Sequence, residues 1–210
     1  MSFNKVFILG LPRTGTTSIC SALLNEGLSV AHTAYTDKTF EDAQVLADTP
    51  IYCDYQALDK HYPNSKFVVL TRPLEAWLPS IKQLLLRMFV NVTRDDGGFN
   101  PIIKRSFTSV FSPFTKENIE NDDFLLQCYN NHLNKIKSHF NGRDDDVIYI
   151  DVSNDNDYEK LCLFLNITSE HSAFPHLNIG GKVTAWSDIK DKNKIASTKN
   201  GRVTKLPYPV

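Results

Sequence analysis

Residues 5–17 read KVFILGLPRTGTT, and this stretch decides the fold. Its first six residues are almost wholly apolar, which is typical of a short strand that is buried on both faces. Gly10, Pro12 and Gly15 then favour a turn, and residues 16–25 carry apolar side chains at helical spacing. The stretch therefore predicts a strand, a tight loop and a helix in direct succession.

The loop has the G-x-x-x-x-G frame of a phosphate-binding loop, or P-loop. Such a loop directs backbone N–H groups and the positive end of a helix at an anion. We expect the anion to contact Pro12, Arg13, Thr14, Gly15, Thr16 and Thr17. In nucleoside triphosphatases and kinases a lysine follows the second glycine. Here that position is Thr16, and Arg13 is the cation that the loop offers instead, so the loop favours an anion other than a magnesium-bound triphosphate.

Strand and helix patterns alternate along the rest of the chain. We expect further strands at 28–32, 66–71 and 146–151, and helices at about 39–47, 55–61, 73–87, 122–140 and 157–165. This alternation predicts an α/β fold of the P-loop NTPase type, with a central parallel sheet flanked by helices in three layers. Residues 1–210 are interpreted as one domain, with an irregular lid or insertion at about 91–121 and a polar C-terminal segment at about 176–210.

The composition indicates a globular protein, with 41% hydrophobic and 22% charged residues. A formal net charge of -1 gives no overall field that would attract nucleic acid. Neither a secretion signal nor an apolar run of ~18 residues is evident, so we expect a cytoplasmic protein without a membrane partner. The four cysteines lack metal-binding spacing and are interpreted as reduced core thiols: Cys20, Cys53, Cys128 and Cys162.

A second anion-binding pattern follows the strand at 66–71. Arg72 stands at the C-terminal end of this strand, and Ser80 comes eight residues later in the next helix. Ligands of open α/β sheets bind at that edge. Arginine can make a forked contact with a phosphate, and serine can donate from its hydroxyl. The alternative is a surface arginine and a buried helical serine without a ligand.

Together the two patterns resemble the P-loop sulfotransferase family, whose donor is 3′-phosphoadenosine 5′-phosphosulfate. Members carry a lysine-free loop for the 5′-phosphosulfate, similar to residues 12–19 here, and a strand-end arginine and a serine for the 3′-phosphate, similar to Arg72 and Ser80. Residues 47–77 and 174–178 also resemble a microbial and fungal sulfotransferase-like subgroup. The resemblance implies metal-free transfer of a sulfuryl group from this donor to a hydroxyl or amine.

The resemblance extends more weakly to the C-terminal segment. The family has an Arg-Lys-Gly segment that touches the 3′-phosphate, and residues 197–202 are its counterpart here. From this segment the resemblance implies Lys199 and Arg202 as donor-binding residues. The alternative is a solvated basic tail.

The general base is the point at which this sequence departs from the family. Many cytosolic relatives carry a histidine in a T-H-x-P segment, and Asp48 occupies the histidine position here. An ordinary aspartate, with a pKa near ~4, is a weak base unless it is buried, and Asp48 could instead cap a local turn. His32 and Glu41 are rival bases. Arg13 is expected to contact the bridging oxygen of the donor.

Two other functions stay open at this stage. A P-loop kinase of a small metabolite could use Asp151 as a magnesium ligand, although the loop lacks the lysine that such a kinase needs. A non-catalytic nucleotide-binding relative is the second alternative, because the usual histidine is absent. The acceptor, a small molecule or a glycan, and the oligomeric state are likewise open.

Overall fold

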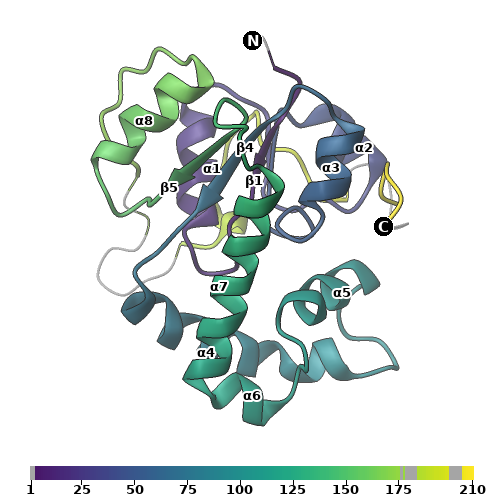
Figure 1. Ribbon diagram of the computed structural model, residues 1–210. Helices are drawn as coiled ribbons and strands as arrows, with labels where there is room; N and C mark the ends of the chain where they lie inside the picture. The colour runs from purple at the N-terminus through teal and green to yellow at the C-terminus, as the bar shows by residue number, and fades with distance from the viewer. Residues whose placement is uncertain (1–2, 176, 178–183, 199–204) are drawn as a thin grey trace.

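The computed structural model describes residues 3–175, 177, 184–198 and 205–210 (Figure 1). Its centre is a parallel sheet of five strands in the order β2-β3-β1-β4-β5. The strands are β1 (Val6–Ile8), β2 (Val30–Ala31), β3 (Val45–Ala47), β4 (Lys66–Leu70) and β5 (Val147–Ile150). The predicted α/β fold with a central parallel sheet is confirmed.

The first strand lies between β3 and β4, with Val6 opposite both Val45 and Lys66. The chain adds β2 and β3 on one side of β1 and then crosses to add β4 and β5 on the other side. Such a reversal opens a crevice beyond the carboxyl ends of the strands, where ligands of α/β sheets bind. The predicted phosphate loop follows β1 and Arg72 follows β4, so both lie at this crevice.

Helices cover both faces of the sheet (Figure 1). Alternate residues of β1 point to opposite faces, with Val6 and Ile8 in one core and Phe7 in another. The first core is covered by α1 (Thr16–Asn25) and α8 (Asn156–Leu165), and the second by α2 (Asp37–Asp42), α3 (Tyr55–His61) and the C-terminal part of α7 (Asp122–His139). These are the three expected layers, and the helices expected at 55–61, 122–140 and 157–165 are confirmed.

A third core is built mainly from helices and lies below the sheet in Figure 1. It is formed by α4 (Leu74–Thr93), α5 (Pro101–Val110), α6 (Lys116–Glu120) and the N-terminal part of α7. Trp77 is fully buried in this core. Because α7 contributes Leu125 here and Ile136 to the sheet core, one helix joins the two regions.

The prediction of an irregular segment at about 91–121 is wrong, because α4 continues to Thr93 and the helices α5 and α6 follow. Asn100 accepts a hydrogen bond from the backbone N–H of Ile103 and caps α5, with Pro101 in its first turn. Thr115 caps α6 in the same way. The capping residues Asn100 and Thr115 favour helices here, even though the glycines and prolines of this segment suggested a loop. The division of the chain into domains stays a prediction.

The helix expected at 39–47 is also wrong in its second half. Helix α2 ends at Asp42, and Val45–Ala47 form β3 instead. All three residues of β3 are fully buried between β1 and β2. A strand of three residues carries too little periodicity to be recognised, and pairing with its neighbours decides its conformation.

Candidate active site

The loop after β1 has a backbone that requires glycine at its last position. Gly15 has φ +102°, and a Cβ at this residue would lie 2.4 Å from Cγ2 of Val152. Arg13 also adopts a left-handed conformation, with φ +74°. The buried Thr14 hydroxyl donates to the carbonyl of Leu11 at 2.7 Å, so this side chain closes the turn and does not face a ligand.

The N-terminus of α1 offers free donors to an anion. No described residue accepts a hydrogen bond from the backbone N–H groups of Gly15, Thr16 or Thr17. Such N–H groups, together with the partial positive charge of the helix end, bind phosphate and sulfate groups. The loop that the sequence predicts therefore fits an anion such as phosphate or sulfate.

The second predicted pattern lies against the same loop. Arg13 Nε donates to Ser80 Oγ at 2.7 Å, and Arg72 Nη1 donates to the carbonyl of Arg13 at 2.6 Å. The indole of Trp77 donates to the carbonyl of Pro12 at 3.0 Å. Because Trp77 is part of the core of helices, this core supports the phosphate loop. The structure thus brings Arg13, Arg72 and Ser80 together.

Positive charge at this second position has no acidic partner. Burial and the neighbouring guanidinium groups of Arg72 and Arg87 lower the pKa of Arg13. Within the described part of the chain, none of these three arginines pairs with a carboxylate. Three neighbouring cations without a counter-ion favour the binding of an anion. Sequence reasoning missed Arg87, although it stands seven residues after Ser80, two turns along the same face of α4.

Two candidate bases meet at the other end of the loop. His32 follows β2 and Asp48 follows β3, and because these parallel strands are neighbours, both residues lie at the carboxyl edge of the sheet. Nε2 of His32 lies 3.2 Å from Oγ1 of Thr16, 3.3 Å from Oγ1 of Thr17 and 3.9 Å from Oδ2 of Asp48. We call these four residues the imidazole cluster.

The carboxylate of Asp48 is held by several donors. Asp48 has φ +53°, and its Oδ1 accepts from the backbone N–H of Thr49 at 2.7 Å and from the Thr49 hydroxyl at 2.9 Å. The hydroxyl of Thr16 donates to Oδ2 at 3.5 Å. These contacts fix the orientation of the Asp48 carboxylate. Glu41 is not brought into the cluster, because its exposed carboxylate pairs with Lys38 at 3.1 Å on α2.

The surroundings of His32 favour a neutral imidazole. Burial and the positive charge of Lys194 lower the pKa of His32, whereas Asp48 opposes them. The imidazole also stacks on the indole of Trp186, with ring centroids 5.3 Å apart. A neutral imidazole at neutral pH is the form that can accept a proton.

The sequence suggested three further residues for the site, namely Lys199, Arg202 and Asp151. Lys199 and Arg202 lie outside the described residues. Asp151, the magnesium ligand of the kinase alternative, accepts hydrogen bonds from the backbone N–H and hydroxyl of Ser153. Across the described ranges, no group of three or more His, Cys, Asp or Glu side chains could hold a metal ion. In the same ranges, no helix combines the length and apolar character needed to cross a membrane.

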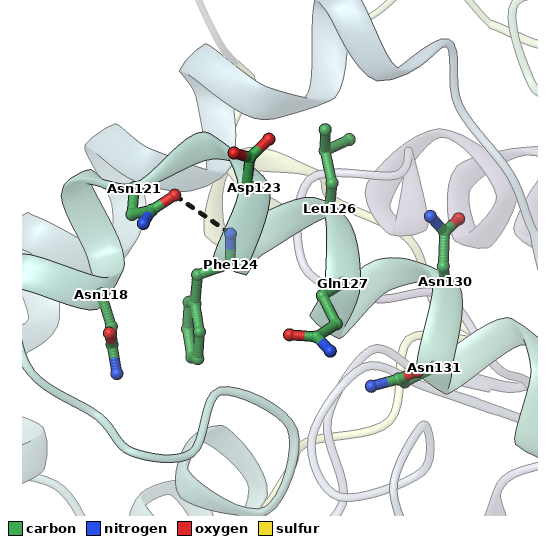
Figure 2. Close-up of a pocket in the computed structure, with 8 residues that line it drawn as sticks. All are labelled: Asn118, Asn121, Asp123, Phe124, Leu126, Gln127, Asn130 and Asn131. Atoms are coloured by element: carbon green, nitrogen blue, oxygen red, sulfur yellow. Dashed lines mark hydrogen bonds between the residues drawn. The ribbon is translucent and has the colours of Figure 1, made fainter.

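A shallow hollow of about 680 Å³ on α6 and α7 is not part of this site (Figure 2). Amide side chains dominate its lining, and two of them serve the local backbone: Asn118 donates to the carbonyl of Pro113, and Asn121 caps α7. Gln127 and Asn131 are exposed. Tyr129, whose hydroxyl accepts from the backbone N–H of Arg72 at 3.0 Å, is buried on α7. The hollow therefore lies on the solvent side of α7, away from the arginines.

Comparison with known proteins agrees with this geometry. A family model described as a sulfotransferase domain matches residues 30–183, more than half of the chain. The match includes His32, Asp48, Arg72 and Ser80 and begins after the phosphate loop. No curated protein matches the chain. The family match favours sulfuryl transfer over the kinase and non-catalytic alternatives. The chain belongs to the sulfotransferase domain family and is a transferase.

Proposed function

We propose that the protein transfers a sulfuryl group from 3′-phosphoadenosine 5′-phosphosulfate to a hydroxyl or amine of a small-molecule or glycan acceptor. One observation carries the choice of donor. The contact between Arg13 Nε and Ser80 Oγ joins two anion-binding positions that follow neighbouring strands. A nucleotide with anionic groups on both its 5′ and 3′ sides needs two such positions, whereas ADP needs one.

Each end of the donor has its own residues in this proposal. The N–H groups of Gly15, Thr16 and Thr17 hold the 5′-phosphosulfate, since they have no acceptor among the described residues. Arg72 and Ser80 hold the 3′-phosphate through charge-assisted and hydroxyl hydrogen bonds. Arg13 lies between the two positions. Its contact with Ser80 favours the 3′-phosphate side, and its contact with the bridging oxygen stays a prediction.

His32 acts as the general base in this proposal. Its Nε2 takes the proton of the acceptor hydroxyl or amine while the acceptor oxygen or nitrogen forms a bond to sulfur. The bond between sulfur and the bridging oxygen breaks, and its electron pair stays on the 5′-phosphate. The hydroxyls of Thr16 and Thr17 lie within 3.3 Å of Nε2, so the base faces the loop where this charge develops. Asp48 orients this cluster and stabilises the protonated imidazole at 3.9 Å.

Calorimetric titration with 3′-phosphoadenosine 5′-phosphate tests the donor assignment. We expect the bisphosphate to bind more tightly than ADP, and the double variant Arg72→Ala, Ser80→Ala to lose affinity by about 100-fold, as expected for one charged and one neutral hydrogen bond. Lys82→Ala is the matched control, because Lys82 is on α4 near Ser80 but pairs with Asp122. A preference for magnesium ATP, or equal binding of ADP, would refute the proposal.

A further inference from the structure

The C-terminal part of the chain covers the edge of the sheet beside His32. Val30 of β2 donates its backbone N–H to the carbonyl of Asn193 at 3.0 Å and accepts from the N–H of Ile195 at 2.8 Å. Val30 and Lys194 form a parallel bridge. Residues 193–195 therefore extend the sheet next to β2, the strand that directly precedes His32.

Trp186 lies on a short 3₁₀ turn, η1 (Trp186–Asp188), that precedes this bridge. Its indole stacks on the imidazole of His32 with an interplanar angle of 26°. The ammonium group of Lys194 lies 4.8 Å from the centroid of the indole. Lys194 also donates to the carbonyls of Trp186 and Ile189, so it fixes the turn that carries the indole.

We propose that Trp186 is a positioning residue for sulfuryl transfer: its indole holds the imidazole of His32 with Nε2 toward Thr16 and Thr17 and shields the ring from water. This inference rests on the proposed function, in which His32 removes the acceptor proton. Trp186 itself forms no hydrogen bond with the hydroxyls of Thr16 and Thr17 or with Asp48, all of which are described residues. Its effect is therefore transmitted through the orientation and hydration of one imidazole.

The groups that face His32 determine the direction of the expected effect. Asp48 faces it from the end of β3, Lys194 from the C-terminal segment, and the hydroxyls of Thr16 and Thr17 from α1. Burial is the largest influence on the pKa of His32 and lowers it. Loss of the indole hydrates the ring, so the pKa rises. Because the base acts in its neutral form, the acid limb of the pH–rate profile then moves to higher pH.

The experiment compares Trp186→Leu with Trp186→Phe in the chain of residues 1–210. NMR titration of the imidazole Cε1–H, assigned with a His32→Gln variant, reports the pKa of His32 without donor or acceptor. We expect Trp186→Leu to raise this pKa by about half a unit to one unit and to lower kcat about tenfold at neutral pH through misplacement of the base. Affinity for 3′-phosphoadenosine 5′-phosphate should stay unchanged. Trp186→Phe keeps an aromatic face and should remain close to the native protein in all three measurements.

An unchanged pKa of His32 in Trp186→Leu would overturn the inference, as would a shifted pKa with no movement of the acid limb of kcat/KM. Equal losses in Trp186→Leu and Trp186→Phe would also count against stacking as the cause. Failure of the native protein to bind the bisphosphate would instead refute the proposed function. The two failures are distinguishable, because the NMR titration uses the protein alone.

Discussion

The two ends of the site differ in charge and in the part of the fold that supports them. The end that we propose to bind the 3′-phosphate, here called the phosphate end, comprises Arg13, Arg72 and Ser80; it is cationic and rests on the core of helices around Trp77. The proposed transfer end is the imidazole cluster, which has one carboxylate and lies where the ends of β2 and β3 meet the first turn of α1. The difference teaches that binding of the 3′-phosphate and proton transfer can be altered separately, because the residues proposed for each rest on different cores.

The largest expected effect comes from His32→Gln, which removes the proposed base but can keep a hydrogen bond to the loop. We expect kcat to fall by about 10²–10⁴-fold, the usual contribution of general base catalysis. Calorimetry with 3′-phosphoadenosine 5′-phosphate should give unchanged affinity. Asp48→Asn is the companion variant, and its effect on kcat should be smaller because Asp48 orients the base. A greater loss in Asp48→Asn than in His32→Gln would reverse the two roles.

Gly15→Ala should destabilise the loop that serves both ends, because Gly15 lies between Arg13 of the phosphate end and Thr16 of the imidazole cluster. A left-handed alanine costs about 1–2 kcal/mol, and overpacking against Val152 adds about 1–3 kcal/mol. Urea unfolding measures the change in the free energy of unfolding. Gly27→Ala is the control, since Gly27 has φ +79° but no atom within 4 Å of the added Cβ. Equal destabilisation by the two changes would show that the contact with Val152 is unimportant.

His132 lies in neither end of the site, so its protonation should change the free energy of unfolding without changing the rate of sulfuryl transfer. Burial lowers its pKa to about 4 in the folded protein. Below the ordinary histidine pKa of about 6.5, the unfolded chain binds a proton that the folded protein does not. The free energy of unfolding therefore decreases as the pH is lowered from about 6.5 to about 4. The lowered pKa corresponds to about 3 kcal/mol over this range. In His132→Leu, urea unfolding should lose this part of the pH dependence, whereas the same slope in both proteins would argue against a neutral buried His132.

Arg87→Gln is the smallest expected change and affects only the phosphate end. Arg87 is an exposed cation that influences Arg13 through charge alone, and less strongly than Arg72 does. Affinity for the bisphosphate should fall about two- to threefold at low salt, and the difference should vanish at high salt. Arg94→Gln is the matched control, because Arg94 at the end of α4 pairs with Asp96 at 2.9 Å. A loss that persists at high salt would indicate a direct contact.

Sequence patterns predicted the phosphate end better than the transfer end. The loop after β1 and Arg72 after β4 each follow a strand that an apolar run makes visible, and the family resemblance connects them. The pairing of Arg13 with Ser80 could not be predicted, because it joins residues that are far apart in the chain and depends on how α4 packs. Arg87 could have been found from its helical spacing to Ser80.

The transfer end could not be predicted as one cluster, because the short strand β3 was not recognised in the sequence. His32 and Asp48 were expected as rival bases, and with residues 45–47 expected in a helix nothing placed the two side chains together. Once Val45–Ala47 is a strand next to β2, the two side chains must emerge at the same edge of the sheet. Trp186 could not have been predicted to contact His32, since nothing local in residues 184–198 indicates that this segment returns to β2.

Helix α7 has a consequence for hydrogen exchange. Its N-terminal part belongs to the core of helices and its C-terminal part to the sheet core, and the hydroxyl of Tyr129 in the former bonds the backbone of Arg72. When α4, α5 and α6 open as one cooperative unit, the amides around Tyr129 lose their protection, while those around Ile136 keep the sheet as a partner. The hold of Tyr129 on the backbone of Arg72 is then released while the imidazole cluster stays folded. If Arg72 binds the 3′-phosphate as we propose, the opening that exposes these amides also loosens that phosphate.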